Sequence, residues 1–276
     1  METPTQHQPS VNMQAKKSLG QHFLTSSDIA RAVVTAGGVQ PGDVVLEIGP
    51  GTGILTTELL AQDARVIAIE KDADAIAILQ ERFAREQKEG KLTIVEGDIR
   101  ACTPESLGIS GAYKIVANIP YYITGEILRA SLTQAHQPKS MALLVQKEVA
   151  ERICRSPKES LLSLSVKVYG VPSYVRTVRA GSFNPPPKVD SAILAIANIS
   201  RENFLDISES CFFSLIKKAF SEKRKQVQAT LGALVGKENL FTALDELNIN
   251  PQTRPEDIDS TLWLALAKKL QPFMHK

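Results

Sequence analysis

The segment Asn118-Ile119-Pro120-Tyr121 combines carbonyl acceptors with an aromatic ring. The side-chain carbonyl of Asn118 and the backbone carbonyl of Ile119 can accept the two hydrogens of an exocyclic amine. An adenine amine is a poor nucleophile because its lone pair is delocalised into the ring, and two such acceptors help to free that pair. The ring of Tyr121 offers a face for base stacking. The segment therefore indicates chemistry on an adenine amine, and a turn with a buried aromatic side chain is the alternative.

A second aromatic candidate is Phe183, which precedes Asn184 and three prolines at positions 185, 186 and 187. Such a stiff, extended segment can hold the ring of Phe183 over a flipped base. The alternative is a rigid connector between two strands, with Phe183 buried in the core. The sequence leaves both interpretations open.

The segment EIGPGTG, residues 47–53, follows an apolar run and precedes a helical pattern, which is where open α/β sheets bind ligands. Gly49 and Gly51 let a ligand approach the backbone. A dinucleotide fingerprint would place its last glycine at position 54, but Ile54 stands there and Gly53 comes one position early. Because that last glycine serves a pyrophosphate, the pattern favours a ligand without one, such as S-adenosylmethionine. An ordinary strand-to-helix turn is the alternative.

Two acidic residues follow the next predicted strands. Glu70 ends the second strand, where a carboxylate can accept hydrogen bonds from both hydroxyls of a ribose. Asp98 ends the third strand, where it can accept from an adenine amino group. The alternatives are a favourable charge at a helix N-terminus for Glu70 and a turn residue for Asp98.

Apolar, β-branched runs alternate with segments of helical periodicity from residue 43 to residue 161, which is typical of a parallel sheet with helices on both faces. The parallel strands are predicted over residues 44–48, 65–70, 92–98, 113–120 and 141–146. Two later segments, 174–178 and 191–197, are expected to add an antiparallel edge. From residue 208 onward only short amphipathic helices are predicted, over residues 211–220, 226–235, 239–247 and 260–270. The expected fold is α/β, a Rossmann-like methyltransferase sheet with a small all-α C-terminal domain.

The chain has 276 residues, 43% of them apolar, with 32 Lys and Arg against 30 Asp and Glu. The net charge of +2 excludes a basic coat over the whole surface, so contacts with nucleic acid must be local. Cys102, Cys154 and Cys211 are odd in number and far apart, which argues for a reducing compartment. The histidines lack metal-ligand spacing, so no metal is expected, and no apolar run reaches the roughly 20 residues of a membrane helix.

Domain limits follow from the same patterns. We expect residues 1–15 to form a disordered polar tail, residues 16–200 a catalytic domain and residues 208–276 a helical domain. The tail lacks the apolar core of a signal peptide, which favours a cytoplasmic protein.

With these residues in view, the chain from about Lys16 to Leu270 closely resembles the small-subunit ribosomal RNA adenine N6-dimethyltransferases of the KsgA type. The resemblance is carried by KKSLGQHFL, EIGPGTGILT, EGDI, NIPYYIT, LLVQKEVAERI, FNPPPKVDSAI, AFSEKRKQ and TRPEDI. It implies S-adenosylmethionine-dependent transfer of four methyl groups to two adjacent adenines near the 3′ end of 16S rRNA. The partner it implies is this rRNA within the small ribosomal subunit or its precursor, and we expect the protein to act as a monomer.

The resemblance also assigns roles by position. It implies a cofactor pocket lined by His22, Leu24, Gly49, Gly51, Glu70, Asp98 and Asn118. It implies that Ile119, Tyr121 and Phe183 surround the target adenine. One departure is His22, where many relatives have Asn, so an imidazole must hold the methionine end of the cofactor.

A basic cluster in the C-terminal part is the expected RNA contact. Its members are Lys217, Lys218, Lys223, Arg224 and Lys225, with Lys16 and Lys17 adding charge where order begins. Relatives often carry two arginines in AFSEKRKQ, so the bidentate geometry toward phosphate is partly lost here. A solvated helix face is the alternative.

Two other functions compete with this prediction. A 23S rRNA adenine methyltransferase of the resistance type shares the cofactor motifs, but FNPPPKVDSAI and the helical tail favour the small-subunit enzyme. A non-catalytic assembly or transcription factor would keep the pocket only as a remnant, and the intact Asn118, Tyr121 and Phe183 argue against it.

Overall fold

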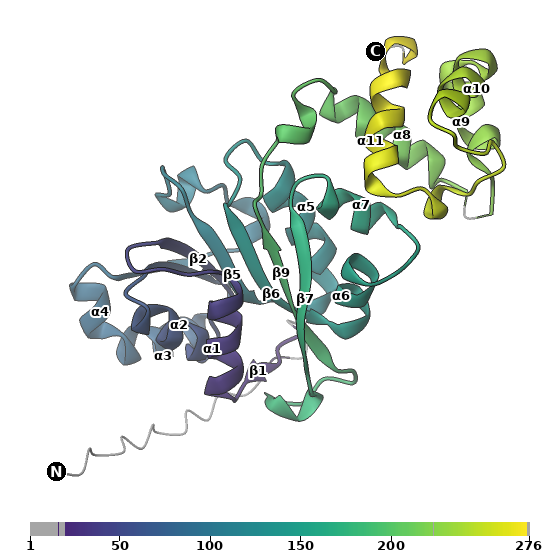
Figure 1. Ribbon diagram of the computed structural model, residues 1–276. Helices are drawn as coiled ribbons and strands as arrows, with labels where there is room; N and C mark the ends of the chain where they lie inside the picture. Colours follow the sequence, from purple (N-terminus) through teal and green to yellow (C-terminus); the bar gives the residue numbers. More distant parts are fainter. Residues whose placement is uncertain (1–15, 17–19, 223, 275–276) are drawn as a thin grey trace.

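A mostly parallel, seven-stranded sheet forms the centre of the computed structural model, which describes residues 16, 20–222 and 224–274 (Figure 1). The predicted tail and two of the predicted RNA-binding lysines, Lys17 and Lys223, lie outside the described residues. The strands of this sheet are β2 (Val44–Ile48), β3 (Arg65–Glu70), β4 (Leu92–Glu96), β5 (Lys114–Asn118), β6 (Ser140–Gln146), β7 (Val171–Val178) and β9 (Ser191–Ala197).

The strand order is β4-β3-β2-β5-β6-β9-β7. The strands β2 to β6 are parallel to one another, which confirms the predicted parallel sheet. The last two strands, β9 and β7, are antiparallel and form the predicted edge, with an irregularity in register between Tyr174 and Arg176. Because the order reverses between β2 and β5, a ligand crevice is expected at their carboxyl ends.

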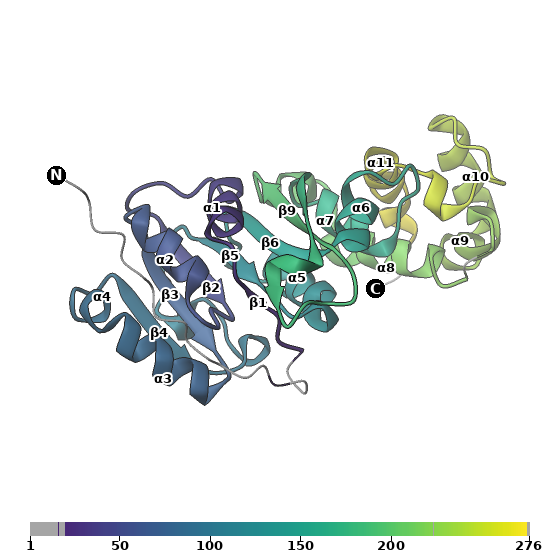
Figure 2. The same cartoon turned by 90° about the horizontal axis from the view of Figure 1, so that it is seen from below.

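Helices cover both faces of the sheet, as the apolar strands require (Figure 2). Val45 of β2 packs in one core cluster with residues of the helices that precede β4, and its neighbour Leu46 packs in the other with residues of the helices that follow β5. The helices on the Val45 side are α1 (Ser27–Ala36), α2 (Ile54–Ala61) and α3 (Ala73–Arg82), and a short α4 (Ala84–Lys88) follows. Those on the Leu46 side are α5 (Thr124–Thr133), α6 (Lys147–Cys154) and α7 (Leu161–Lys167).

A small second sheet joins distant parts of the chain. Its strands are β1 (Phe23–Leu24) and β8 (Phe183–Asn184), which pair antiparallel. Next to them, the backbone of Thr25 donates a hydrogen bond to the carbonyl of Ser182 at 3.0 Å. The sequence analysis did not predict this sheet, because strands of two residues carry no periodicity. Its effect is to place the N-terminal segment beside the proline-rich loop.

The C-terminal part is helical, as predicted. It contains α8 (Glu209–Ala219), α9 (Val227–Val235), α10 (Lys237–Glu246) and α11 (Ser260–Leu270). In Figure 1 these helices form a group of their own beyond α7, yet Phe212 and Trp263 belong to the same buried cluster as Tyr169 and the α5 side of the sheet. The two parts therefore share one hydrophobic core.

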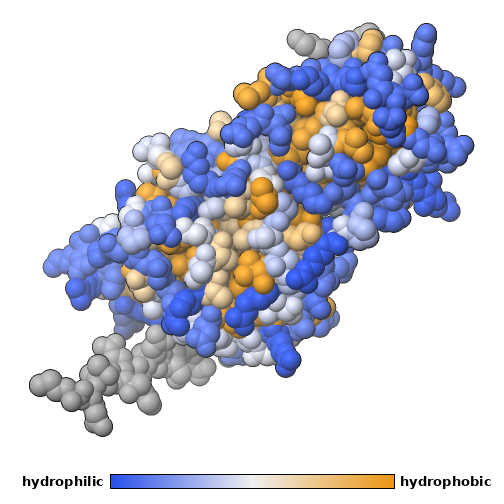
Figure 3. Space-filling model, in the orientation of Figure 1, coloured by the Kyte–Doolittle hydropathy of each residue, from blue (hydrophilic) through white to orange (hydrophobic). Residues whose placement is uncertain are grey.

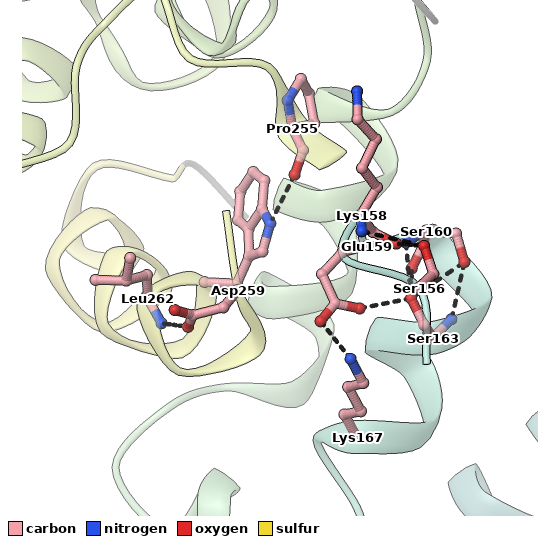
Figure 4. A network of polar contacts seen from close by, with 10 residues as sticks. Ser156, Lys158, Glu159, Ser160, Ser163, Lys167, Pro255, Asp259 and Leu262 are labelled. Atoms are coloured by element: carbon pink, nitrogen blue, oxygen red, sulfur yellow. Dashed lines mark hydrogen bonds and ion pairs between the residues drawn. The ribbon is translucent and has the colours of Figure 1, made fainter. Parts of the chain in front are cut away.

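Polar contacts also join the two parts (Figure 4). The backbone amide of Glu159, just before α7, donates to the carbonyl of Glu256 at 2.7 Å. The carboxylate of Glu159 accepts from Ser163 and Lys167 of α7, which ties this junction to the catalytic part. On the other side, the indole of Trp263 in α11 donates to the carbonyl of Pro255 at 3.2 Å. These bonds fix how α11 approaches α7.

Among the described residues, no helix is long and apolar enough to cross a membrane, and no cluster of three His, Cys, Asp or Glu side chains has the geometry of a metal site.

Candidate active site

A cavity opens at the carboxyl ends of β2, β3, β4 and β5, where the sheet topology predicts it. It is lined by residues 20–24, 48–52, 54–55, 69–71, 97–100 and 118–123. This one cavity brings together nine of the predicted residues, from five segments of the chain: His22, Leu24, Gly49, Gly51, Glu70, Asp98, Asn118, Ile119 and Tyr121.

Two glycines of the loop between β2 and α2 have different structural roles. Gly49 has φ +66°, and a Cβ placed there would meet only the carbonyl oxygen of Asn118, at 3.9 Å, so this side of the loop is open to a ligand. Gly53 has φ +82°, and a Cβ there would lie 2.6 Å from the ring of Phe83 and 2.9 Å from Leu79. Gly53 thus allows α3 to pack closely, and Gly49 leaves the room that a cofactor needs.

An arginine that the sequence analysis did not single out forms hydrogen bonds to this loop. Arg82, at the end of α3, donates to the carbonyl of Thr52 at 2.8 Å and to the hydroxyl of Thr57 at 3.0 Å. Partial burial lowers the pKa of Arg82. A charged residue in the last turn of a predicted helix is expected to be exposed to solvent, so the sequence gave no signal for this role.

The carboxylate of Glu70 is buried and held by three backbone amides. Its Oε1 accepts from Lys71 at 2.8 Å and from Asp72 at 2.9 Å, and its Oε2 accepts from Gly51 at 3.1 Å. A carboxylate offers about four lone-pair positions, so Oε2 keeps one for a further donor. This geometry fits one ribose hydroxyl, whereas the sequence analysis expected the carboxylate to accept from two.

Asp98 is engaged more fully than the sequence analysis expected. Arg100 binds its carboxylate in a bidentate arrangement at 2.9 and 2.5 Å, and the Arg100 backbone amide donates at 3.1 Å. Lys71 adds a bond of 3.2 Å. These hydrogen bonds, with that of the Arg100 side chain strongest, hold the pKa of Asp98 well below its usual range. Both cationic side chains are exposed, and one of them must swing away before Asp98 can accept from an adenine amine.

His22 and Asn118 are oriented by backbone carbonyls. Nδ1 of His22 lies 2.8 Å from the carbonyl oxygen of Pro185, so Nδ1 carries the proton and Nε2 of the neutral ring is an acceptor. Nδ2 of Asn118 donates to the carbonyl of His22 at 3.0 Å. Since a carbonyl can only accept, Oδ1 of Asn118 is the atom that remains for another donor. An acceptor at His22 fits the ammonium group at the methionine end of S-adenosylmethionine.

Tyr121 and Ile119 complete the wall next to Asn118. The hydroxyl of Tyr121 hydrogen-bonds to that of Ser191 at 2.5 Å, and its ring stacks against His22 with centroids 5.9 Å apart. Burial raises the pKa of Tyr121. The side chain of Ile119 is buried, which anchors its peptide group at the cavity wall. Leu24 is buried in β1, where it pairs with Phe183 of β8 in the small sheet.

Phe183 is not among the residues that line the cavity. Its side chain is 3% exposed, and Phe183 pairs with Leu24 across the small sheet. It belongs to a core cluster with Val178 and Ile193. The structure thus shows the packing of the core alternative, and the stacking role of Phe183 stays a prediction.

Tyr122 is an aromatic residue at the mouth of the cavity that the sequence analysis did not select. It is 65% exposed, and its ring packs beside Gly20. The only signal in the sequence was its place after Tyr121.

Glu47 lies beneath the glycine loop and is fully buried. Thr56 donates to its Oε2 at 2.7 Å, while Oε1 has no hydrogen-bond partner among the described residues. Burial raises the pKa of Glu47 to about 8, and repulsion from Glu70 adds to this. Glu47 is therefore protonated at neutral pH.

The basic cluster lies in the C-terminal part, away from the cavity. Lys217 and Lys218 are exposed in the last turn of α8, and Arg224 and Lys225 are exposed in the connection to α9. Lys225 is also 3.9 Å from Glu222. These side chains are accessible to RNA, but cations at a helix C-terminus are also favourable without a ligand.

Comparisons with known proteins agree with this site. A family model described as ribosomal RNA adenine dimethylase matches residues 12–272. A ribosomal RNA small subunit methyltransferase A from Dehalococcoides mccartyi is 38% identical over 258 residues, 92% of this chain and 88% of that protein. One from a Synechococcus species is 39% identical over 267 residues, 93% and 95% of the two chains.

Solved structures give the same picture. A dimethyladenosine transferase from Plasmodium falciparum is similar with a TM-score of 0.76 and 28% identity, over 89% of this chain and 96% of that one. The 23S rRNA methyltransferase ErmE has a TM-score of 0.74 at 23% identity, over 90% and 99% of the chains, and so shares the fold.

Proposed function

Because the chain belongs to the ribosomal RNA adenine dimethylase family, we propose that it methylates N6 of two adjacent adenines near the 3′ end of 16S rRNA. It is an S-adenosylmethionine-dependent methyltransferase that dimethylates adenine in rRNA. Each adenine receives two methyl groups, so that four are transferred in all.

One observation carries the proposal: Asn118 lines the cavity with its amide nitrogen already committed to the carbonyl of His22, so its Oδ1 remains for another donor. An acceptor fixed in this way binds a hydrogen of the adenine amine without a cost for orienting the side chain. The backbone carbonyl of Ile119 is the second acceptor in this proposal. Together they align the amine lone pair for an in-line displacement.

The cofactor fits the residues that are present. Its adenosine would lie along the open side of Gly49, with a ribose hydroxyl donating to Oε2 of Glu70. The ammonium of its methionine end would donate to Nε2 of His22, and Asp98 would accept from its adenine amine once released by Arg100 or Lys71. When bound, S-adenosylmethionine supplies the methyl group on a sulfonium.

The reaction needs no strong base beside Asn118. Attack by the neutral amine on the methyl group breaks its bond to sulfur and gives a methylated ammonium, whose proton passes to water afterwards. Alignment therefore supplies much of the rate.

The small subunit is the favoured substrate particle. The chain shares 38–39% identity with proteins named for the small subunit, against 23% with a 23S methyltransferase. We infer that the enzyme acts in the cytoplasm on the small subunit or its precursor, and that it acts as a monomer.

The exposed cations of the C-terminal part are proposed to bind the RNA backbone. Reversing Lys217, Lys218, Arg224 and Lys225 to Glu should weaken binding to the small subunit and lower its salt dependence. Affinity for S-adenosylmethionine should stay unchanged, because these residues lie outside the cavity. An unchanged salt dependence would show that these side chains are only solvated and do not contact the RNA.

The experiment that tests the proposed substrate offers both subunits to the enzyme. Undermethylated small subunits and large subunits are incubated separately with labelled S-adenosylmethionine, and incorporated methyl groups are counted. We expect about four per small subunit and none per large subunit. Label in the large subunit alone would favour the 23S alternative.

A further inference from the structure

One corner of the molecule carries cations that have no partner among the described residues. Arg176 near the end of β7, Arg179 just after it, and Lys188 in the following loop are all exposed. None of these side chains makes an ion pair or hydrogen bond with a described residue. By contrast, Lys147 and Arg152 on the neighbouring α6 pair with Glu151 and Glu148. We call Arg176, Arg179 and Lys188 the β7 corner.

The chain around the β7 corner forms a wall of backbone next to the cavity and is bonded to His22 and Tyr121, which line the cavity. The carbonyl of Ser182 accepts from Thr25, that of Pro185 accepts from His22, and the hydroxyl of Ser191 bonds to Tyr121. The inner side of segment 179–190 is thus fixed to the residues beside Asn118. Its cations lie on the same segment and are exposed to solvent.

The three cations are close together. Val178 pairs with Ser191 across the sheet, and the amide of Ala180 donates to Asp190 at 3.0 Å, so the two ends of the segment meet. Chain length keeps Lys188 within about 7 Å of Asp190 and Arg176 within about 11 Å of Arg179. Asp190 is the only acidic residue in segment 171–190, and its carboxylate is committed to Ala180.

Clustered like charges repel one another and add nothing to the stability of the fold. They do favour the approach of an anionic strand to this side of the molecule. Figure 1 shows that β7 runs from the side of α7 to the side of β1, so its end lies at the cavity side of the sheet. In Figure 3 the lower part of this face mixes strongly hydrophilic side chains with small apolar areas.

We propose that the β7 corner binds the phosphates of the nucleotides that flank the target adenines. This inference rests on the proposed function and adds a second RNA contact, at the cavity mouth, to the cluster of the C-terminal part. An adenine that enters the cavity must leave its neighbours outside, and their phosphates then lie against this wall. Arg176 and Arg179 have planar guanidinium groups that suit bidentate contacts with phosphate.

The test compares two double charge reversals. Arg176→Glu with Arg179→Glu changes the β7 corner, and Arg65→Glu with Lys88→Glu is the control. Arg65 and Lys88 are also exposed, have no ion pair among the described residues, and lie toward the opposite edge of the sheet. Binding to undermethylated small subunits is measured across a salt series, and binding of S-adenosylmethionine is measured by calorimetry.

We expect the corner variant to bind the subunit at least tenfold more weakly than the control variant at about 0.1 M salt. The slope of log affinity against log salt should fall by about 1.4, which is about 0.7 for each single-stranded phosphate contact. Cofactor affinity should not change. Equal affinity and slope in the two variants would overturn the proposal.

Two further outcomes are distinguishable. If the corner variant loses affinity for the subunit but binds protein-free 16S rRNA like the control, the corner contacts a ribosomal protein and the RNA proposal fails. If the parent enzyme transfers no methyl group to the subunit, the proposed function fails, whatever the binding of the variants.

Discussion

The amide nitrogen of Asn118 donates to the backbone carbonyl of His22 at 3.0 Å, across 96 positions of the chain. This bond joins the end of β5 to the segment before α1, and it decides which atom of Asn118 remains for the substrate. Because His22 itself donates to Pro185, the orientation of Asn118 depends on the small sheet that holds this loop. The orientation of the proposed acceptor for the adenine amine therefore depends on three segments of the chain.

Glu70→Ala should weaken binding of S-adenosylmethionine. The substitution removes a charge-assisted acceptor from the ribose, worth roughly 1.5–3 kcal/mol, or about 10- to 150-fold in affinity. It also frees the amides of Gly51, Lys71 and Asp72, so Glu70→Gln is the milder companion variant. Calorimetry on folded protein measures both, and parental affinity in both would remove Glu70 from the cofactor site.

His22→Phe should weaken binding of S-adenosylmethionine several-fold, because the variant keeps an aromatic ring but loses the Nε2 acceptor. His22→Asn keeps a hydrogen-bond acceptor and should lose less affinity. Calorimetry on folded protein measures both variants. Parental affinity in His22→Phe would show that the imidazole does not contact the cofactor.

Phe183→Ala should lower the free energy of unfolding by about 3–5 kcal/mol, because the ring is buried in the core. Phe183→Leu fills most of the same space and should cost less than about 1.5 kcal/mol, with methylation near the parental rate. Denaturant unfolding and single-turnover methylation measure the two effects. A stable Leu variant that methylates slowly would restore the stacking role predicted from the sequence.

The stability of the protein should depend on pH through Glu47. Its pKa is about 8 in the folded protein against an ordinary 4.5, so the folded state keeps a proton that the unfolded chain releases. The free energy of unfolding therefore falls as pH rises from about 4.5 to about 8, by at most roughly 1.4 kcal/mol per pH unit, and levels off above.

Glu47→Gln removes this dependence and should stabilise the protein relative to the parent most strongly above pH 8. Unfolding in denaturant at several pH values isolates the effect, with the exposed Glu81→Gln as the control. A parent and a Glu47→Gln variant with parallel pH curves would contradict a buried, protonated Glu47.

The parallel sheet and its antiparallel edge were predictable, because long apolar strands and helices carry clear periodicity, whereas the strand order comes from the structure. The cavity was predictable for the same reason, since Gly49, Glu70, Asp98 and Asn118 all follow strands that end at one edge. The small sheet was not, because pairing between Leu24 and Phe183 depends on a tertiary contact.

The details of the site that the sequence did not predict also depend on tertiary contacts. Whether Phe183 points into the core or the cavity depends on that pairing, and the sequence kept both alternatives. The full engagement of Asp98 by Arg100 and Lys71, and the role of Arg82 behind the glycine loop, arise from side chains brought together by folding.

The most direct test maps the methylated nucleotides in undermethylated small subunits after a single turnover with the parent enzyme and with Asn118→Ala. The parent should give N6,N6-dimethyladenosine at two adjacent adenines near the 3′ end of 16S rRNA. With saturating cofactor and RNA, Asn118→Ala should be slower by two or more orders of magnitude, roughly, while remaining folded and still binding the subunit. Methylation elsewhere in the rRNA, or a parental rate in Asn118→Ala, would contradict the account.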